Sequence, residues 1–118
     1  MVRTQKTRDN SSVIARRLKE ARLRAGVSQK TLGIRAGIDE FSSSARVNQY
    51  ERGKHVPAYS TLERFADVLN VPTEFFYSRD NVVAEMLILF FNLSPQQKTR
   101  CISFLRKLGK QGETKEKL

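Results

Sequence analysis

An asparagine and a glutamine stand side by side at positions 48 and 49, inside the basic stretch ARVNQYERGKHVP of residues 45–57. Val47 and Tyr50 are three residues apart, so a helix that buries both would turn its polar residues outward. That outer side would carry small, amide and basic side chains: Ser44, Ala45, Asn48, Gln49 and Arg52. Asn and Gln amides can form two hydrogen bonds with adenine in the major groove of DNA, and Ala can contact a thymine methyl group. The pattern favours base reading; an exposed polar face without a ligand is the alternative, above all for Asn48.

The charge balance favours an anionic partner. The 118 residues include 22 Lys and Arg against 12 Asp and Glu, a net charge of +10. Residues 1–54 hold thirteen of the cations and five of the acids, a net +8, whereas residues 55–118 carry a net +2. A field of this sign attracts polyanions, and its concentration in one half indicates a nucleic-acid face rather than a general aid to solubility. Arg52 and Lys54 would leave the helix where DNA phosphates lie.

Other classes of function find little support. Cys101 and His55 are single residues of their types, so neither a disulfide within the chain nor a cysteine or histidine metal site is expected. No carboxylate pair, nucleophile–base set or phosphate loop is recognisable, so we expect neither an enzyme nor a cofactor. The run VVAEMLILFF at 82–91 is about half as long as a membrane-spanning helix and contains Glu85. Residues 1–12 are polar and carry no signal peptide pattern, so we expect a cytoplasmic protein.

Cap and stop signals divide the chain into helices, and no strand pattern is present. Ser28 is a predicted N-cap and Gly37 a predicted helix end. The segments 60–63 and 94–97 have the Ser-x-x-Glu/Gln spacing of a capping box. The sequence therefore predicts helices over 13–25, 28–36 and about 44–52, from Ser60, from Pro72, over 81–93 and from Ser94 to about Leu108.

Three segments, in their order and spacing, resemble the helix-turn-helix regulators of the lambda-repressor and Cro type (XRE-like): SQKTLGIRAG, VNQYERGKHVP and STLERFADVLNVPTEFF. The resemblance covers about residues 13–77. It implies an all-α fold with a five-helix DNA-binding domain over 12–78. The residues outside the resemblance predict a flexible basic arm over 1–11 before this domain and two C-terminal helices after it. The resemblance also implies a transcriptional regulator that binds double-stranded DNA, most often a repressor of phage or bacterial type.

The resemblance implies roles for single residues. Ser44, Ala45 and Gln49 match base-reading positions, with Asn48 beside them. Phosphate contacts are expected at Gln29, Ser43, Arg46, Arg52 and Lys54, and Ser43 would also cap the recognition helix. Arg22 and Glu51 match a partly buried ion pair that joins the first helix to the recognition helix. In the arm, Arg3, Lys6 and Arg8 could follow the groove, or the arm could be a disordered tail.

The turn between the two motif helices departs from the family pattern. Counted back from Glu51, the chain has four extra residues within IDEFSS. Either the turn is a longer loop, or the recognition helix begins early with Asp39 as its cap. Three consecutive Ser residues are poor helix formers, so we expect the loop.

The segment 79–108 is predicted to mediate oligomerisation, and 109–118 to be a disordered tail. Residues 82–93 are apolar nearly all round, and such a helix needs partners on every side. We expect a homodimer through Val83, Met86, Leu87, Phe90, Phe91, Ile102 and Leu105. An enlarged monomer core is the alternative. The function expected is repression from a palindromic operator bound as a dimer, with no small-molecule ligand. The alternative function is a DNA-binding antitoxin or adaptor whose C-terminal helices bind a different protein.

Overall fold

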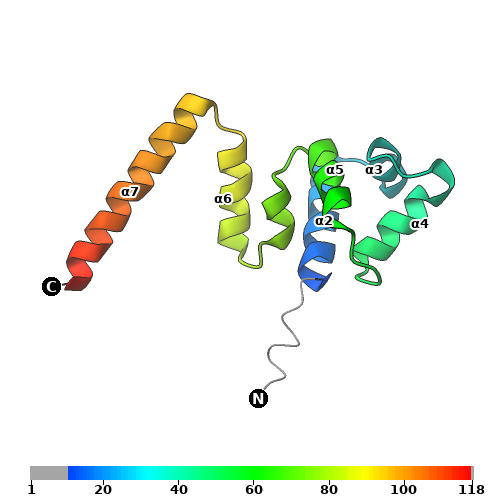
Figure 1. Cartoon of the computed structure of the whole chain (residues 1–118), viewed down its shortest axis with the longest axis horizontal. Helices are drawn as coiled ribbons and strands as arrows, with labels where there is room; N and C mark the ends of the chain where they lie inside the picture. The colour runs from blue at the N-terminus through cyan, green and yellow to red at the C-terminus, as the bar shows by residue number, and fades with distance from the viewer. Residues whose placement is uncertain (1–10, 118) are drawn as a thin grey trace, which may run out of the picture.

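The computed structural model describes residues 11–117, and this part of the chain contains α-helices and one 3₁₀ helix but no strand. The elements are α2 (Ser11–Ala25), α3 (Gln29–Arg35), α4 (Glu40–Glu51), α5 (Tyr59–Leu69), η1 (Thr73–Tyr77), α6 (Asn81–Phe91) and α7 (Pro95–Lys117). The all-α prediction is confirmed, although the fifth element is a 3₁₀ helix. Figure 1 shows α2 to η1 gathered into a head, from which α6 and α7 lead away. None of the described helices is long and apolar enough to cross a membrane.

The head is held together by apolar side chains that its helices turn inward. Leu18 of α2, Leu32 of α3 and Leu62 of α5 are fully buried in one cluster with Val47 of α4. The ring of Tyr50 meets the edge of Phe65 at 6.0 Å between centroids, which fixes α4 against α5. Two of the α4 positions chosen for their spacing are therefore buried as predicted.

The predicted caps at Ser28 and Ser94 form. The Ser28 side chain accepts a hydrogen bond from the Thr31 amide at 3.0 Å, as expected of an N-cap. At the start of α7, Gln97 and Ser94 bond each other's backbone amides, at 2.9 Å and 3.1 Å. The prediction for Ser60 is wrong, because α5 begins one residue earlier, at Tyr59, and Ala58 holds the cap position without a side-chain bond.

The expected loop before the recognition helix is in fact helical. α4 begins at Glu40, and Asp39 caps it by accepting the Phe41 amide at 3.0 Å. The serine run has a low helix propensity, but packing outweighs it, because Ser43 is fully buried against α3. A methyl group at Gly33 would lie 2.6 Å from the Ser43 Cβ, so glycine is what allows the two helices to approach so closely.

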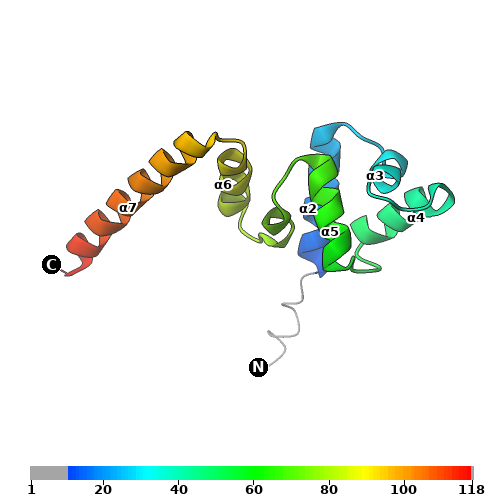
Figure 2. The same ribbon diagram turned by 45° about the horizontal axis from the view of Figure 1, so that its top comes forward.

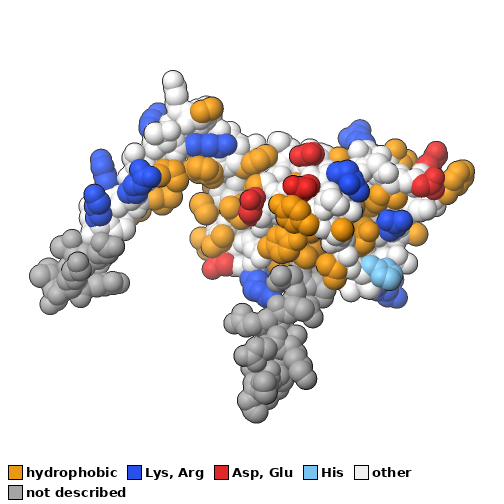
Figure 3. Space-filling view, viewed as in Figure 1, with side chains coloured by type: hydrophobic (Ala, Val, Ile, Leu, Met, Phe, Trp, Pro, Cys, Tyr) orange, Lys and Arg blue, Asp and Glu red, His pale blue; other side chains and the backbone are white. Residues whose placement is uncertain are grey.

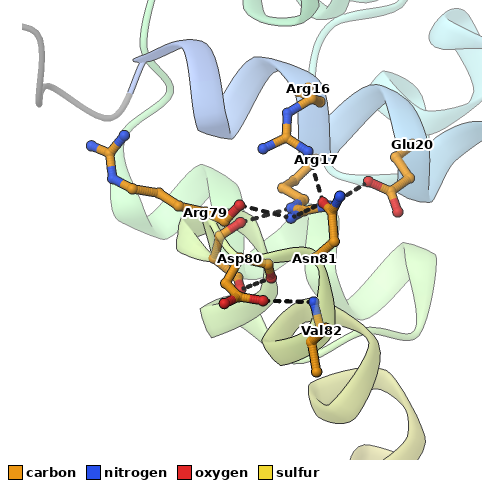
Figure 4. Close-up of polar contacts among 8 residues, drawn as sticks. Arg16, Arg17, Glu20, Arg79, Asp80, Asn81 and Val82 are labelled. Atoms are coloured by element: carbon orange, nitrogen blue, oxygen red, sulfur yellow. Dashed lines mark hydrogen bonds and ion pairs between the residues drawn. The ribbon is translucent and has the colours of Figure 1, made fainter.

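A buried arginine joins the head to α6. Arg17 of α2 is 2% exposed. Its guanidinium donates to the Ser78 carbonyl at 2.8 Å, to the Asn81 Oδ1 at 3.0 Å and to Glu20 at 2.9 Å (Figure 4). It also lies 5.6 Å from the centre of the Phe75 ring. These bonds fix the turn between η1 and α6, and no sequence signal distinguished Arg17 from its neighbour Arg16.

Of the two C-terminal helices, α6 joins the core of the head only through Ala84 and the partly buried Ile88, and α7 does not enter it. Ala84 is the one buried residue of α6, and α7 does not pack along any other helix of the described chain. Figures 1 and 2 agree that α7 diverges from α6. Figure 3 shows hydrophobic side chains gathered on the side of α7 that faces α6. The large apolar residues left exposed on these helices are Val82, Val83, Met86, Leu89, Phe91, Phe104, Leu105 and Leu108.

The prediction of a disordered tail over 109–118 is wrong as far as the structure describes it, because α7 continues to Lys117. The sequence predicts a helix end at about Leu108, just before Gly109, and a second glycine follows at position 112. A glycine inside a helix costs only about 1 kcal/mol relative to alanine. Lys110, Gln111 and the Glu and Lys residues that follow are good helix formers, so the two glycines do not end the helix.

Candidate nucleic-acid interface

The outer side of α4 brings together most of the predicted DNA-contacting residues. The helix buries Ser43, Val47 and Tyr50 against the head. Ser44, Ala45 and Arg46 are exposed, whereas Asn48 and Gln49 are half-buried. Because residues three and four apart lie on one side of a helix, this arrangement forms a continuous polar strip along α4. The strip has small side chains toward the start of the helix and amides toward its end.

The two neighbouring amides of the strip have different surroundings. The Asn48 Oδ1 accepts a hydrogen bond from the Gln29 amide at 3.2 Å, so it helps to join α3 to α4. Among the described residues, the Gln49 amide has no hydrogen-bond partner, and its donor and acceptor can both serve a ligand. Gln49 is therefore better placed than Asn48 for a bidentate contact with a base.

Gln29 is also less free than the resemblance implied. Its amide donates to Asn48 and, at 3.1 Å, to the Glu51 Oε1. The side-chain oxygen of Gln29 accepts no hydrogen bond from the described residues. This oxygen is only an acceptor, so it cannot donate a hydrogen bond to a phosphate. A phosphate contact through this side-chain amide would require one of the two bonds to open. No sequence signal announced the bond between Gln29 and Asn48, which lie nineteen residues apart.

A carboxylate at the end of α4 gathers these side chains into one network. Arg22 of α2 donates to Glu51 through Nε at 2.5 Å and through Nη2 at 3.0 Å. A third donor of Arg22 holds the Val27 carbonyl at 3.0 Å. The side chains of Arg22 and Glu51 are 11% and 3% exposed. The structure thus contains the ion pair that the resemblance implied, and it ties α4 to both α2 and α3.

Ser43 cannot contact a phosphate. Its side chain is fully buried, and its hydroxyl donates to the carbonyls of Ile38 and Asp39 at 3.0 Å and 2.8 Å. The reason is the early start of α4, which moves Ser43 from the predicted cap position to the inward side of the first turns. Both predicted roles of Ser43, as helix cap and as phosphate contact, are therefore wrong.

The basic residues at the end of α4 point into solvent. Gly53 takes a positive φ of 74° and turns the chain away just after the helix, which is the usual use of glycine at a helix end. Arg46, Arg52 and Lys54 are exposed, and none forms an ion pair with another described residue. Their charge remains available for an anion. The arm residues Arg3, Lys6 and Arg8 lie outside the described residues.

The described residues contain no cluster that could form a metal centre. No group of three His, Cys, Asp or Glu side chains within residues 11–117 could hold a metal ion. The polar strip on α4, together with the exposed cations beside it, is therefore the surface that we consider as the candidate site.

Comparisons with known proteins agree with this geometry. The family model described as helix-turn-helix domain matches residues 13–74, more than half of the chain. None of the curated proteins compared with the chain matches it. Among solved structures, the crystal structure of the transcriptional regulator BswR is similar, with a TM-score of 0.75 and 45% sequence identity. The alignment covers 79% of this chain and 92% of that one, so the similarity extends beyond the head into the C-terminal helices. The protein belongs to the helix-turn-helix family of the lambda-repressor and Cro type that its sequence resembles.

Proposed function

We propose that this protein is a sequence-specific transcriptional regulator that binds double-stranded DNA, and that it represses by occupying a palindromic operator as a dimer. The observation that carries the proposal is the polar strip of α4. Its small and amide side chains face solvent, while α2 and α3 hold the helix rigid from behind through the Arg22–Glu51 pair. A rigid helix with a narrow outer edge fits the major groove of B-DNA.

The proposed contacts divide between bases and backbone. Ser44, Ala45 and Gln49 would lie against base edges, and the Asn48 Nδ2 would join them while its oxygen stays bonded to Gln29. Arg46, Arg52 and Lys54 would contact phosphates and so contribute affinity that falls as salt rises. A promoter occupied in this way is closed to RNA polymerase, which is the simplest route to repression.

The C-terminal helices supply the proposed dimer interface. A lone helix in water is marginal, and α7 carries exposed Phe104, Leu105 and Leu108 without packing along another helix of the described chain. A second copy would cover this surface and that of α6 through Val83, Met86, Leu87, Phe90, Phe91, Ile102 and Leu105. A two-fold axis through these helices would place two α4 helices at half-sites about 34 Å apart, one turn of DNA.

A different protein could cover the same apolar surface, which would make the chain a DNA-binding antitoxin or adaptor. The same exposed side chains of α6 and α7 motivate this second candidate. Light scattering after size exclusion separates the two. A homodimer at micromolar concentration is expected for the repressor, whereas a monomer would favour the adaptor.

Selection of bound sites from a random duplex pool tests the proposed function. We expect enrichment of one motif with two inverted halves whose centres lie about ten to eleven base pairs apart. Recovery of unrelated sequences after several rounds would contradict sequence-specific binding. A single half-site without its inverted copy would contradict the dimer while leaving DNA recognition intact.

A further inference from the structure

The first turn of α4 presents a large apolar ring to solvent. Phe41 is 94% exposed, which makes it the most exposed of the large hydrophobic residues in the described chain. It lies within IDEFSS, the segment in which the chain has four extra residues relative to the motif, and in the helical extension that replaces the expected loop. A ring left so fully in water contributes almost nothing to the stability of the head.

The backbone beneath this ring is held in place. The Asp39 carboxylate accepts the Phe41 amide at 3.0 Å and caps the helix. Two residues further, the hydroxyl of buried Ser43 holds the carbonyls of Ile38 and Asp39, and its Cβ fits against Gly33 of α3. The turn that carries Phe41 is therefore anchored at both of its ends, and the direction in which its side chain leaves the backbone is set by the fold.

Phe41 extends the polar strip of α4 toward the start of the helix. Ser44, Ala45, Asn48, Gln49 and Arg52 follow it at spacings of three, four, seven, eight and eleven residues. Residues at these spacings share one side of an α-helix. The opposite side is the buried one, with Ser43, Val47 and Tyr50. A helix that lays its strip in the major groove therefore brings the Phe41 ring to the same groove, beside Ser44 and Ala45.

The charges around the ring argue for a base contact rather than a backbone contact. Asp39 and Glu40 precede Phe41, and Glu40 has only Lys30 as a distant partner, at 3.9 Å. Figure 3 shows hydrophobic and acidic side chains together at the outer end of α4. Phosphates would be repelled there. The group in the groove that suits an apolar ring is the 5-methyl of thymine, and Phe is among the side chains that contact it.

We propose that Phe41 is a base-reading residue that recognises the 5-methyl group of thymine in each half-site. The inference rests on the proposed DNA-binding function and adds a residue that neither the family resemblance nor the amide pattern assigned. The ring would give specificity for thymine at a position next to those read by Ser44 and Ala45. It would do so without a hydrogen bond, by excluding water from the methyl group.

Deoxyuridine provides the test, because it differs from thymidine only in lacking the methyl group and keeps every hydrogen-bonding atom. Each thymine of the operator selected from the random pool is replaced singly, in both half-sites, and the dissociation constant is measured for the wild type and for Phe41→Ala. Because Phe41 is exposed, Phe41→Ala should fold normally, and its thermal midpoint should equal that of the wild type. Leu23→Ala, at an exposed residue of α2, is the matched control.

We expect at least one thymine whose replacement weakens wild-type binding by about threefold to tenfold, the size of a lost methyl contact. Phe41→Ala should bind the thymine operator more weakly by a similar factor and show no further loss with deoxyuridine at that position. Leu23→Ala should keep the wild-type sensitivity. Any thymine read by Ala45 should remain sensitive in both variants.

Three results would overturn the proposal, and they differ from a failure of DNA recognition itself. If no thymine replacement matters, or if Phe41→Ala keeps the full set of wild-type sensitivities, Phe41 does not read a methyl group. Unchanged affinity of Phe41→Ala on every duplex would assign the ring to a contact outside DNA. If the random pool yields no operator, that result contradicts the proposed function itself, and the role of Phe41, which depends on that function, is contradicted as well.

Discussion

At the scale of residues, neighbouring side chains of α4 have different tasks: some are available to recognise DNA, and others hold the helix in place. The side-chain amide of Gln49 has no hydrogen-bond partner among the described residues, whereas the Glu51 carboxylate is almost fully buried between Arg22 and Gln29. Asn48 stands between the two, with its oxygen bonded to Gln29. A side chain whose hydrogen bonds are already formed holds its helix in place. A side chain without a hydrogen-bond partner can gain one when the protein binds DNA.

Gln49→Ala should therefore weaken binding to the selected operator by about 1–3 kcal/mol, the usual value of one bidentate base contact. Binding to random duplex should change little, because phosphate contacts carry it. Fluorescence anisotropy on both duplexes measures the difference. Equal losses on the two would remove Gln49 from base reading.

Arg22→Met should lower the free energy of unfolding by about 3 kcal/mol, because it leaves the buried Glu51 carboxylate without its charged partner. The double variant Arg22→Met, Glu51→Leu should recover much of this stability, since it buries no unpaired charge. Urea unfolding followed by circular dichroism compares the two variants. A single variant as stable as the wild type would show that the ion pair contributes little.

At the scale of elements, sequence patterns predicted most of the helices but favoured a loop where α4 begins, and this early start of α4 shapes the interface. Ser28 and the 94–97 pair were recognisable because a cap needs only local residues. The sequence also allows the extension of α4 with Asp39 as its cap, but the low helix propensity of the serine run favours the loop. The packing that reverses this preference involves Gly33 of α3, ten residues before Ser43, and no local pattern announces such a contact. The buried role of Arg17 escaped prediction because its partners lie more than sixty residues away.

The close approach of α3 and α4 makes a sharp prediction for Gly33→Ala. Its added methyl group would stand 2.6 Å from the Ser43 Cβ, so α4 must shift. We expect a loss of about 1–3 kcal/mol in unfolding free energy from overpacking. We also expect a larger loss of operator affinity than of affinity for random duplex, because the strip on α4 moves.

The companion variant Gly33→Ala, Ser43→Gly removes the closest side-chain atoms and should recover operator binding in part. Recovery is incomplete because the Ser43 Cα would still lie 3.0 Å from the new methyl group. If Gly33→Ala binds and unfolds like the wild type, the contact between the two helices does not set the position of α4.

At the scale of the whole molecule, the two functions proposed for the chain lie at opposite ends. The head carries the interface on α4, while α6 and α7 extend from the other side of it (Figure 1). Arg17 joins the two parts through Ser78 and Asn81, so the start of α6 is fixed relative to the head rather than loosely tethered. A dimer formed through those helices would therefore hold its recognition helices at one spacing.

Leu105→Asp should convert the proposed dimer into a monomer, because it places a charge within the apolar surface of α7, where Leu105 is 44% exposed in the single chain. Ser103→Asp, at an exposed position on the opposite side of the same helix, should leave the dimer intact. Light scattering after size exclusion gives the mass of each. Two variants of equal mass would show that this side of α7 is not the interface.

The central claim is that the outer side of α4 occupies the major groove of an operator, and a methylation footprint tests it most directly. Dimethyl sulfate attacks guanine at N7, in the major groove, and adenine at N3, in the minor groove. On the selected operator we predict that the protein protects guanine N7 atoms in two inverted half-sites about one helical turn apart and leaves the adenine N3 atoms between them reactive. Protection confined to adenine N3, or no protection of guanine N7 within either half-site, would contradict the claim.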